Sequence, residues 1–85
     1  MGIDGYTFEG DPIHVKQSDD IGRNVVDNFE TALRRVKKSK GVIVAFSFGR
    51  GAYEEIARVK LHDNLEIQAI SIRELLKTRN QNSSS

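Results

Sequence analysis

The chain has 85 residues, enough for one small domain with a modest core, a size at which self-association often adds stability. It contains no cysteine, so disulfide scaffolds and thiolate metal sites are excluded. Thirteen basic residues nearly balance twelve acidic ones, and the net charge of +1 points to no class of partner. Because the sequence has no signal peptide and no bilayer-length apolar run, we expect a soluble, cytoplasmic protein without membrane contacts.

The first eighteen residues predict a β-hairpin. Residues 2–8 include Tyr, Thr and Phe, and residues 12–18 include Ile and Val. Gly10 and Asp11, which lie between these segments, are typical of a turn.

An amphipathic helix is predicted over residues 21–36, where apolar side chains recur at a spacing of three and four. The polar residues 18–20 are N-cap candidates whose acidic members also suit the start of a helix. Gly41 is the residue expected to end this helix.

The next two elements are a strand and a second helix. Residues 42–46 form a continuous run of β-branched and aromatic residues, typical of a strand buried on both faces, so we expect them to form the central strand. After a loop rich in glycine, residues 52–61 carry apolar side chains from Tyr53 to Leu61 at helical spacing.

The last part of the chain predicts an edge strand over residues 65–72, because apolar and polar residues alternate there. A helical crossover joins this strand to the central one, so the two should be parallel. Residues 73–79 fit a short final helix. The predicted fold is a small mixed α/β sheet in the order hairpin, helix, strand, helix, strand, with one domain over residues 1–78 and a polar, disordered tail over residues 79–85.

Asp4, His14 and Lys16 are the candidate catalytic residues. Phosphodiester hydrolysis needs an activated water and stabilised phosphate charge, which a carboxylate-held magnesium ion and a lysine can supply. His14 and Lys16 are two residues apart on one strand, so they share a face. Asp4 joins that face only if the turn has an odd number of residues or a bulge, and a two-residue turn would place it on the other face. The same three residues would also suit a hairpin that is polar only for solubility.

These residues and the order of the elements resemble the Mrr-like restriction endonuclease family. The signature of its nuclease superfamily is Asp, a spacer, then Glu or Gln, any residue, and Lys. The resemblance rests on Asp4 in Gly-Ile-Asp-Gly, the strand at 13–17, the following helix, the strand at 41–46 and the next helix, which contains Ala-Tyr. It extends from about residue 2 to residue 76.

The resemblance implies a restriction-endonuclease-like fold and a hydrolase that cleaves DNA with a bound metal. Asp4 would bind magnesium, and Lys16 would orient the water or stabilise the transition state. Close versions look like a domain at the end of some prokaryotic DNA methyltransferases. The implied partners are therefore DNA and either a second copy of the chain or a partner domain such as a methyltransferase.

The chain departs from the family pattern in two places. His14 stands where the family has Glu or Gln, and magnesium prefers oxygen ligands. His14 could instead bind manganese or another transition metal, act as a general base, or mark a lost activity. The family's usual first helix is also missing, which would leave one sheet face exposed unless a partner covers it. The alternative function is therefore a catalytically inactive nuclease fold that binds DNA or protein.

Five further residues are candidates for DNA binding. Four of them lie near the start of the first predicted helix, where free backbone N–H groups favour anions, and Arg50 lies at the C-terminal end of the predicted central strand, where open α/β sheets commonly bind ligands. The alternative is that the polar residues only cap a helix and that the glycines beside the arginine only turn the chain. The candidates are Gln17, Ser18, Arg23, Asn24 and Arg50.

Overall fold

The structure, a computed structural model, describes residues 3–83, and it describes side chains for residues 3–77. Within these residues it confirms a small mixed α/β fold of four strands and three helices. In chain order the elements are β1 (Gly5–Tyr6), β2 (Pro12–Lys16), α1 (Arg23–Arg35), β3 (Lys40–Ala45), α2 (Arg50–Asp63), β4 (Glu66–Ser71) and α3 (Ile72–Ser83).

The four strands form one sheet in the order β1-β2-β3-β4. β1 and β2 are antiparallel, whereas β2, β3 and β4 run parallel to one another. The helices α1 and α2 return the chain to the start of the following strand, as parallel pairing requires. β3 is therefore a central strand and β4 an edge strand, so both predictions are confirmed.

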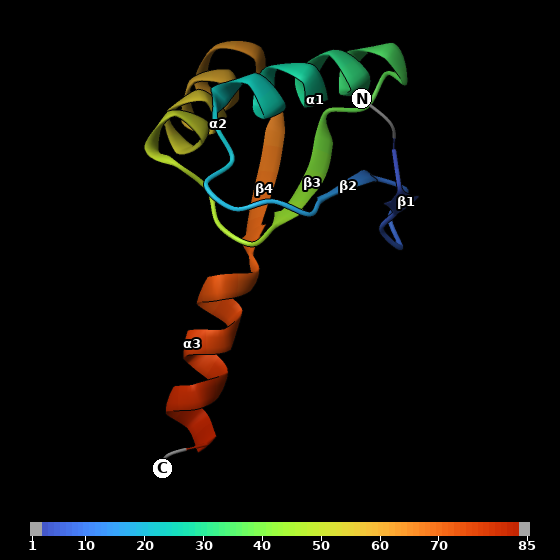
Figure 1. Cartoon of the computed structure of the whole chain (residues 1–85). Coiled ribbons are helices and arrows are strands. Elements are labelled where there is room, and N and C mark those ends of the chain that lie inside the picture. Colours follow the sequence, from blue (N-terminus) through green and yellow to red (C-terminus); the bar gives the residue numbers. More distant parts are fainter. Residues whose placement is uncertain (1–2, 84–85) are drawn as a thin grey trace.

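Both connecting helices lie on the same face of the sheet (Figure 1). Alternate residues of β3 point to this face, and Ile43 and Ala45 are fully buried there. They pack in one core cluster with Phe29 and Leu33 of α1 and with Val59 of α2. The packing of α1 and α2 on the sheet fixes where each helix begins relative to the strands.

The opposite face of the sheet carries apolar side chains that neither α1 nor α2 covers. Val42 and Val44 of β3 are half-buried on this face, and Val15 and Phe46 are exposed. The prediction that the central strand is buried on both faces is therefore wrong for residues 3–83, since no helix precedes β1 among them.

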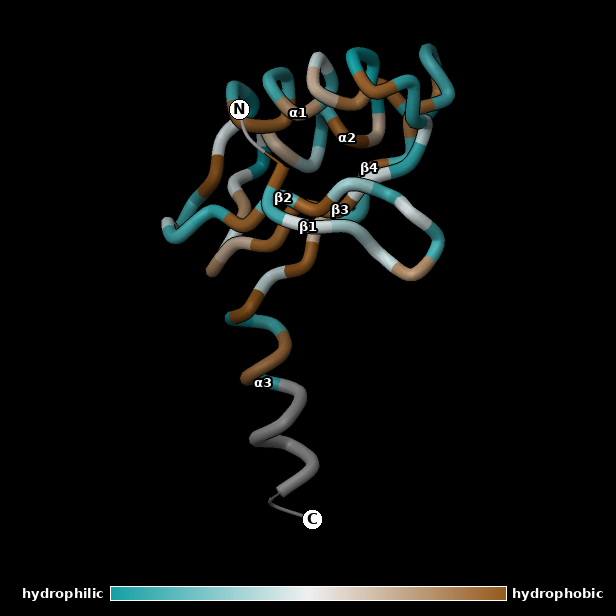
Figure 2. Tube along the Cα trace, turned by 90° about the vertical axis from the view of Figure 1, so that its right-hand side faces the viewer, coloured by the Kyte–Doolittle hydropathy of each residue, from teal (hydrophilic) through white to brown (hydrophobic). Residues whose placement is uncertain are grey.

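α3 begins directly after β4 and extends away from the rest of the molecule (Figures 1 and 2). Its side chains Leu75 and Leu76 are exposed, so this helix contributes little to the core. It continues to Ser83 and thus includes much of the segment expected to be a polar tail. Residues 84 and 85 of that segment lie outside the described residues.

The ends of α1 differ from the prediction. Its N-cap is Gly22, which makes no side-chain capping hydrogen bond, so residues 18–20 do not cap the helix. The helix ends at Arg35, and Lys37 shortly after it has a left-handed backbone with φ of 58°. The chain therefore leaves the helix before Gly41 is reached.

Gly41 serves the packing of α1 on the sheet. It lies in β3, and a Cβ atom at this position would be 2.6 Å from Cε2 of Phe29 and 2.8 Å from Cδ2 of Leu33. The prediction that Gly41 ends the helix is wrong. The missing side chain allows α1 to approach the strand closely.

Candidate functional site

The hairpin turn spans five residues, from Thr7 to Asp11, between the end of β1 and the start of β2. The Thr7 N–H donates to the Asp11 carbonyl at 2.9 Å, and Gly10 has φ of 86°, a conformation that favours glycine. Gly10 and Asp11 therefore belong to the turn as predicted, but they do not form a two-residue turn. The number of loop residues is odd, which was the condition for a shared face.

Asp4, His14 and Lys16 consequently lie on one face of the hairpin. Gly5 pairs with Ile13 across the two strands, so Asp4 lies opposite His14. The Asp4 N–H extends this pairing by donating to the Ile13 carbonyl at 2.8 Å. Lys16 is two residues further along β2 on the same side, roughly 7 Å from His14 along the strand.

Asp4 and His14 are in direct contact. His14 Nδ1 lies 3.2 Å from Asp4 Oδ2, and the same oxygen accepts a hydrogen bond from the Val15 N–H at 2.8 Å. The His14 side chain is only 13% exposed and its ring centroid lies 6.4 Å from that of Phe29, whereas the Asp4 side chain is 52% exposed. The pair is thus anchored against α1 on one side and open to solvent on the other.

Lys16 stands at the carboxyl end of β2, beside a groove about 380 Å³ in volume. The Arg73 guanidinium lies 5.2 Å from the centre of the Phe46 ring in the same region, and this basic residue was not among the predicted site residues. The groove brings together three of the predicted site residues with the start of α3. Its lining residues are Lys16, Gln17, Ser18, Asp19, Phe46 and Ile72.

The remaining predicted DNA contacts lie at the starts of the helices. Arg23 is the first residue of α1, and its Nε is 3.5 Å from Asp27 and 3.4 Å from Glu55, so its charge is already paired. Asn24 follows it and is exposed. Arg50, the first residue of α2, has a side chain 92% exposed, and its Nε lies 3.5 Å from the exposed Glu54 carboxylate. Its environment therefore leaves Arg50 more accessible to a phosphate than Arg23.

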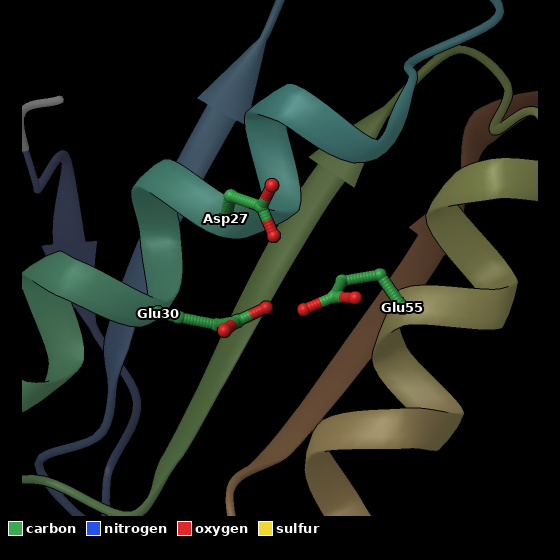
Figure 3. Close-up of side chains that lie close together, drawn as sticks. All are labelled: Asp27, Glu30 and Glu55. Carbon is green, nitrogen blue, oxygen red and sulfur yellow. The ribbon is translucent and has the colours of Figure 1, made fainter.

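A second cluster, between α1 and α2, was missed at the sequence level (Figure 3). It consists of Asp27, Glu30 and Glu55, each of which offers a carboxylate oxygen within 4.8 Å of the others. Glu30 and Glu55 are buried, at 4% and 3% exposure. These three residues could hold a metal ion, because hard cations prefer oxygen ligands.

The apolar pattern of the second helix concealed Glu55. Tyr53 and Leu61, expected on its buried side, are exposed, and α2 instead buries Ala52, Glu55 and Val59. Their spacing of three and four shows that Glu55 occupies an otherwise apolar stripe. Glu55 between Ala52 and Val59 is the signal in the sequence, but it can be interpreted only once the buried side of α2 is known.

Glu55 is closely paired with an arginine, whereas Glu30 is not. Arg58 donates to both oxygens of Glu55, at 2.8 Å and 2.6 Å, and this pairing lowers the pKa of Glu55 to about 2. Burial raises the pKa of Glu30 to about 8, with the neighbouring Glu55 adding to the effect. The Arg34 guanidinium lies 3.8 Å from Oε1 of Glu30, which is too far for a strong hydrogen bond.

In a chelator-containing buffer, the free energy of unfolding should be greatest near pH 4.5. The raised pKa of Glu30 gives a contribution that is complete below its ordinary pKa of 4.5 and is lost as the pH rises toward 8. The lowered pKa of Glu55 gives a contribution that is complete above 4.5 and is lost as the pH falls toward 2. Urea unfolding between pH 3 and pH 9 measures both, and Glu30→Gln should remove the loss above pH 4.5. An unchanged alkaline loss in that variant would contradict the assignment.

No family model, curated protein or solved structure matches the chain. None of the helices in the described part of the chain combines the length and apolarity needed to cross a membrane. The fold and its residues therefore define a small mixed α/β domain with an Asp–His pair on its hairpin and a buried carboxylate cluster between two helices.

Proposed function

We propose that this chain is a metal-dependent DNA endonuclease domain of the Mrr-like restriction type, with Asp4, His14 and Lys16 as its site. The observation that carries the proposal is the hairpin register, because it places Asp4 opposite His14 and on the same face as Lys16. An even-numbered turn would have separated Asp4 from the other two. The order of strands and helices also agrees with the one that the resemblance implies.

The geometry of the Asp4 and His14 pair fits two ligands of one metal ion. Neighbouring ligands of an octahedral ion with bonds of about 2.1 Å lie about 3 Å apart, close to the 3.2 Å between Oδ2 and Nδ1. One carboxylate and one imidazole suit manganese better than magnesium. Such an ion, when bound, activates a water and polarises the phosphate.

The protein's own side chains would share the remaining work. Lys16 is exposed at the end of β2, where its ammonium would stabilise negative charge developing on a phosphate. The Phe29 ring lies beside the His14 ring, and the Val15 N–H donates a hydrogen bond to the Asp4 carboxylate. The DNA backbone would pass Gln17, Ser18, Arg73 and the exposed Arg50.

A second candidate function is a catalytically inactive nuclease fold that binds DNA or protein. Its support is that Asp4 Oδ2 already contacts His14 and accepts the Val15 N–H, so the pair also makes sense as a purely structural link. The open apolar face of the sheet would suit a protein partner, either a second copy or an adjoining domain such as a DNA methyltransferase.

Cleavage of supercoiled plasmid separates the two functions. The wild-type chain should nick the plasmid with manganese, more slowly with magnesium, and not at all with EDTA, because the imidazole disfavours magnesium. The His14→Gln variant restores an oxygen ligand and should raise the magnesium-supported rate above that of the wild type. If the wild type fails with both metals and His14→Gln cuts, the native site is inactive; if neither protein cuts, the nuclease proposal is wrong.

A further inference from the structure

We propose that Asp27, Glu30 and Glu55 bind a hard divalent cation of the magnesium, manganese or calcium type, in a structural site separate from the hairpin. The inference does not depend on nuclease activity. The ion would join α1 to α2, the two helices that cover the sheet.

The backbone brings the three carboxylates together without a special loop. Asp27 and Glu30 are three residues apart on α1 and therefore lie on the same side of that helix. Glu55 approaches them from α2, and all three side chains point into the space between the helices (Figure 3). Opposite oxygen ligands lie about 4.2 Å apart around magnesium and about 5 Å apart around calcium, so carboxylate oxygens within 4.8 Å of one another are close enough for small side-chain adjustments to bring them onto one ion.

Glu30 gives the independent indication of a ligand. Glu30 is only 4% exposed, and its Oε2 atom is buried without a hydrogen-bond partner among the described residues. A buried carboxylate oxygen without a partner is costly, and such atoms usually mark an ion or water. A cation between Asp27 and Glu55 would supply the missing partner.

The nearby arginines limit the affinity but leave room for coordination. Arg58 and Arg23 contact Glu55, and each carboxylate oxygen can accept a hydrogen bond and still bind a metal through its other lone pair. With Arg34 3.8 Å from Glu30, three guanidiniums face the three carboxylates and leave the cluster without net charge. We therefore expect weak binding, with a Kd on the order of 10⁻⁴ to 10⁻³ M, as in calcium sites of low charge.

The competing occupant is a proton shared between Glu30 and Glu55. Such a proton would also give the buried Glu30 oxygen a hydrogen-bond partner, but the stability of the protein would then not depend on divalent cations. Metal-dependent stability therefore distinguishes the two occupants, and a variant of the hairpin distinguishes this site from the proposed catalytic one.

Thermal melting of the full chain with manganese, magnesium or calcium tests the proposal, and electron paramagnetic resonance counts bound manganese. At a tenfold excess over its Kd, the best cation should raise the Tm of the wild type by at least about 4 °C. The Asp4→Asn variant removes the carboxylate of the proposed hairpin site, so it should lose at most one of the bound manganese ions and keep the part of the rise that the carboxylate cluster supplies.

Adding Glu30→Gln to the Asp4→Asn variant should abolish the remaining rise, and Asp27→Asn, at a less buried position, provides the same test if the Glu30→Gln protein does not fold. A Tm that ignores all three cations would overturn the proposal. So would a rise that survives both cluster substitutions in the Asp4→Asn background, or a rise that Asp4→Asn removes completely. Absence of plasmid cleavage by the wild type, with the Tm rise present, would reject the nuclease function and leave this site standing.

Discussion

Replacing Lys16 with alanine should lower the rate of manganese-supported plasmid cleavage by at least about 100-fold, as loss of one charge-stabilising donor does in other enzymes. The Lys16 side chain is exposed at the end of β2, so its loss should leave the fold intact. Single-turnover cleavage gives the rate, and the Tm of the same preparation shows whether the domain is still folded.

Lys60→Ala is the matched control for that experiment. Lys60 is also exposed, but it lies in the last turn of α2 and lines a different pocket from Lys16. Its removal should change the cleavage rate by less than about twofold. Equal cleavage by Lys16→Ala and the wild type would mean that another site or a contaminant cuts the DNA.

Replacing Phe29 with alanine should destabilise the domain by about 3–5 kcal/mol. Phe29 is fully buried and fills the space between α1, Gly41 of β3 and the His14 ring. A domain of this size has a free energy of unfolding of about 4–13 kcal/mol, so the variant should be largely unfolded or close to it. Urea unfolding followed by circular dichroism measures the loss.

The control for Phe29 is Leu61→Ala on α2. The Leu61 side chain is 80% exposed, so its truncation should cost less than about 0.5 kcal/mol. If Phe29→Ala were as stable as Leu61→Ala, the packing of α1 against β3 through Gly41 would be contradicted.

The order and type of the elements were predictable because each segment has a strong local pattern. The run at residues 42–46 was correctly assigned to the central strand, and the alternation at 65–72 to an edge strand. The helix ends were less predictable, since Gly22 and Lys37 take their roles from the path of the chain. Gly41 likewise has a purely tertiary reason for being glycine.

The candidate site was predictable only as far as its residue types. The strand periodicity indicated that Asp4 shares a face with His14 and Lys16 only if the turn has an odd number of residues. The length of the turn became known only from the hydrogen bond between Thr7 and Asp11 in the structure. The carboxylate cluster could not be foreseen in the same way, because it depends on which side of α2 faces α1. Helical spacing alone favoured Tyr53 and Leu61, whereas tertiary packing buried Glu55.

Cleavage by Asp4→Asn tests the central claim most directly, when DNA binding is measured on the same protein. Asparagine keeps an oxygen to accept the Val15 N–H but loses the charge that would hold a metal ion. The account predicts that this variant binds a short DNA duplex as tightly as the wild type, within about threefold, and cuts it at least about 100-fold more slowly with manganese. Cleavage at the wild-type rate would contradict the assignment of Asp4 and the nuclease site built on it.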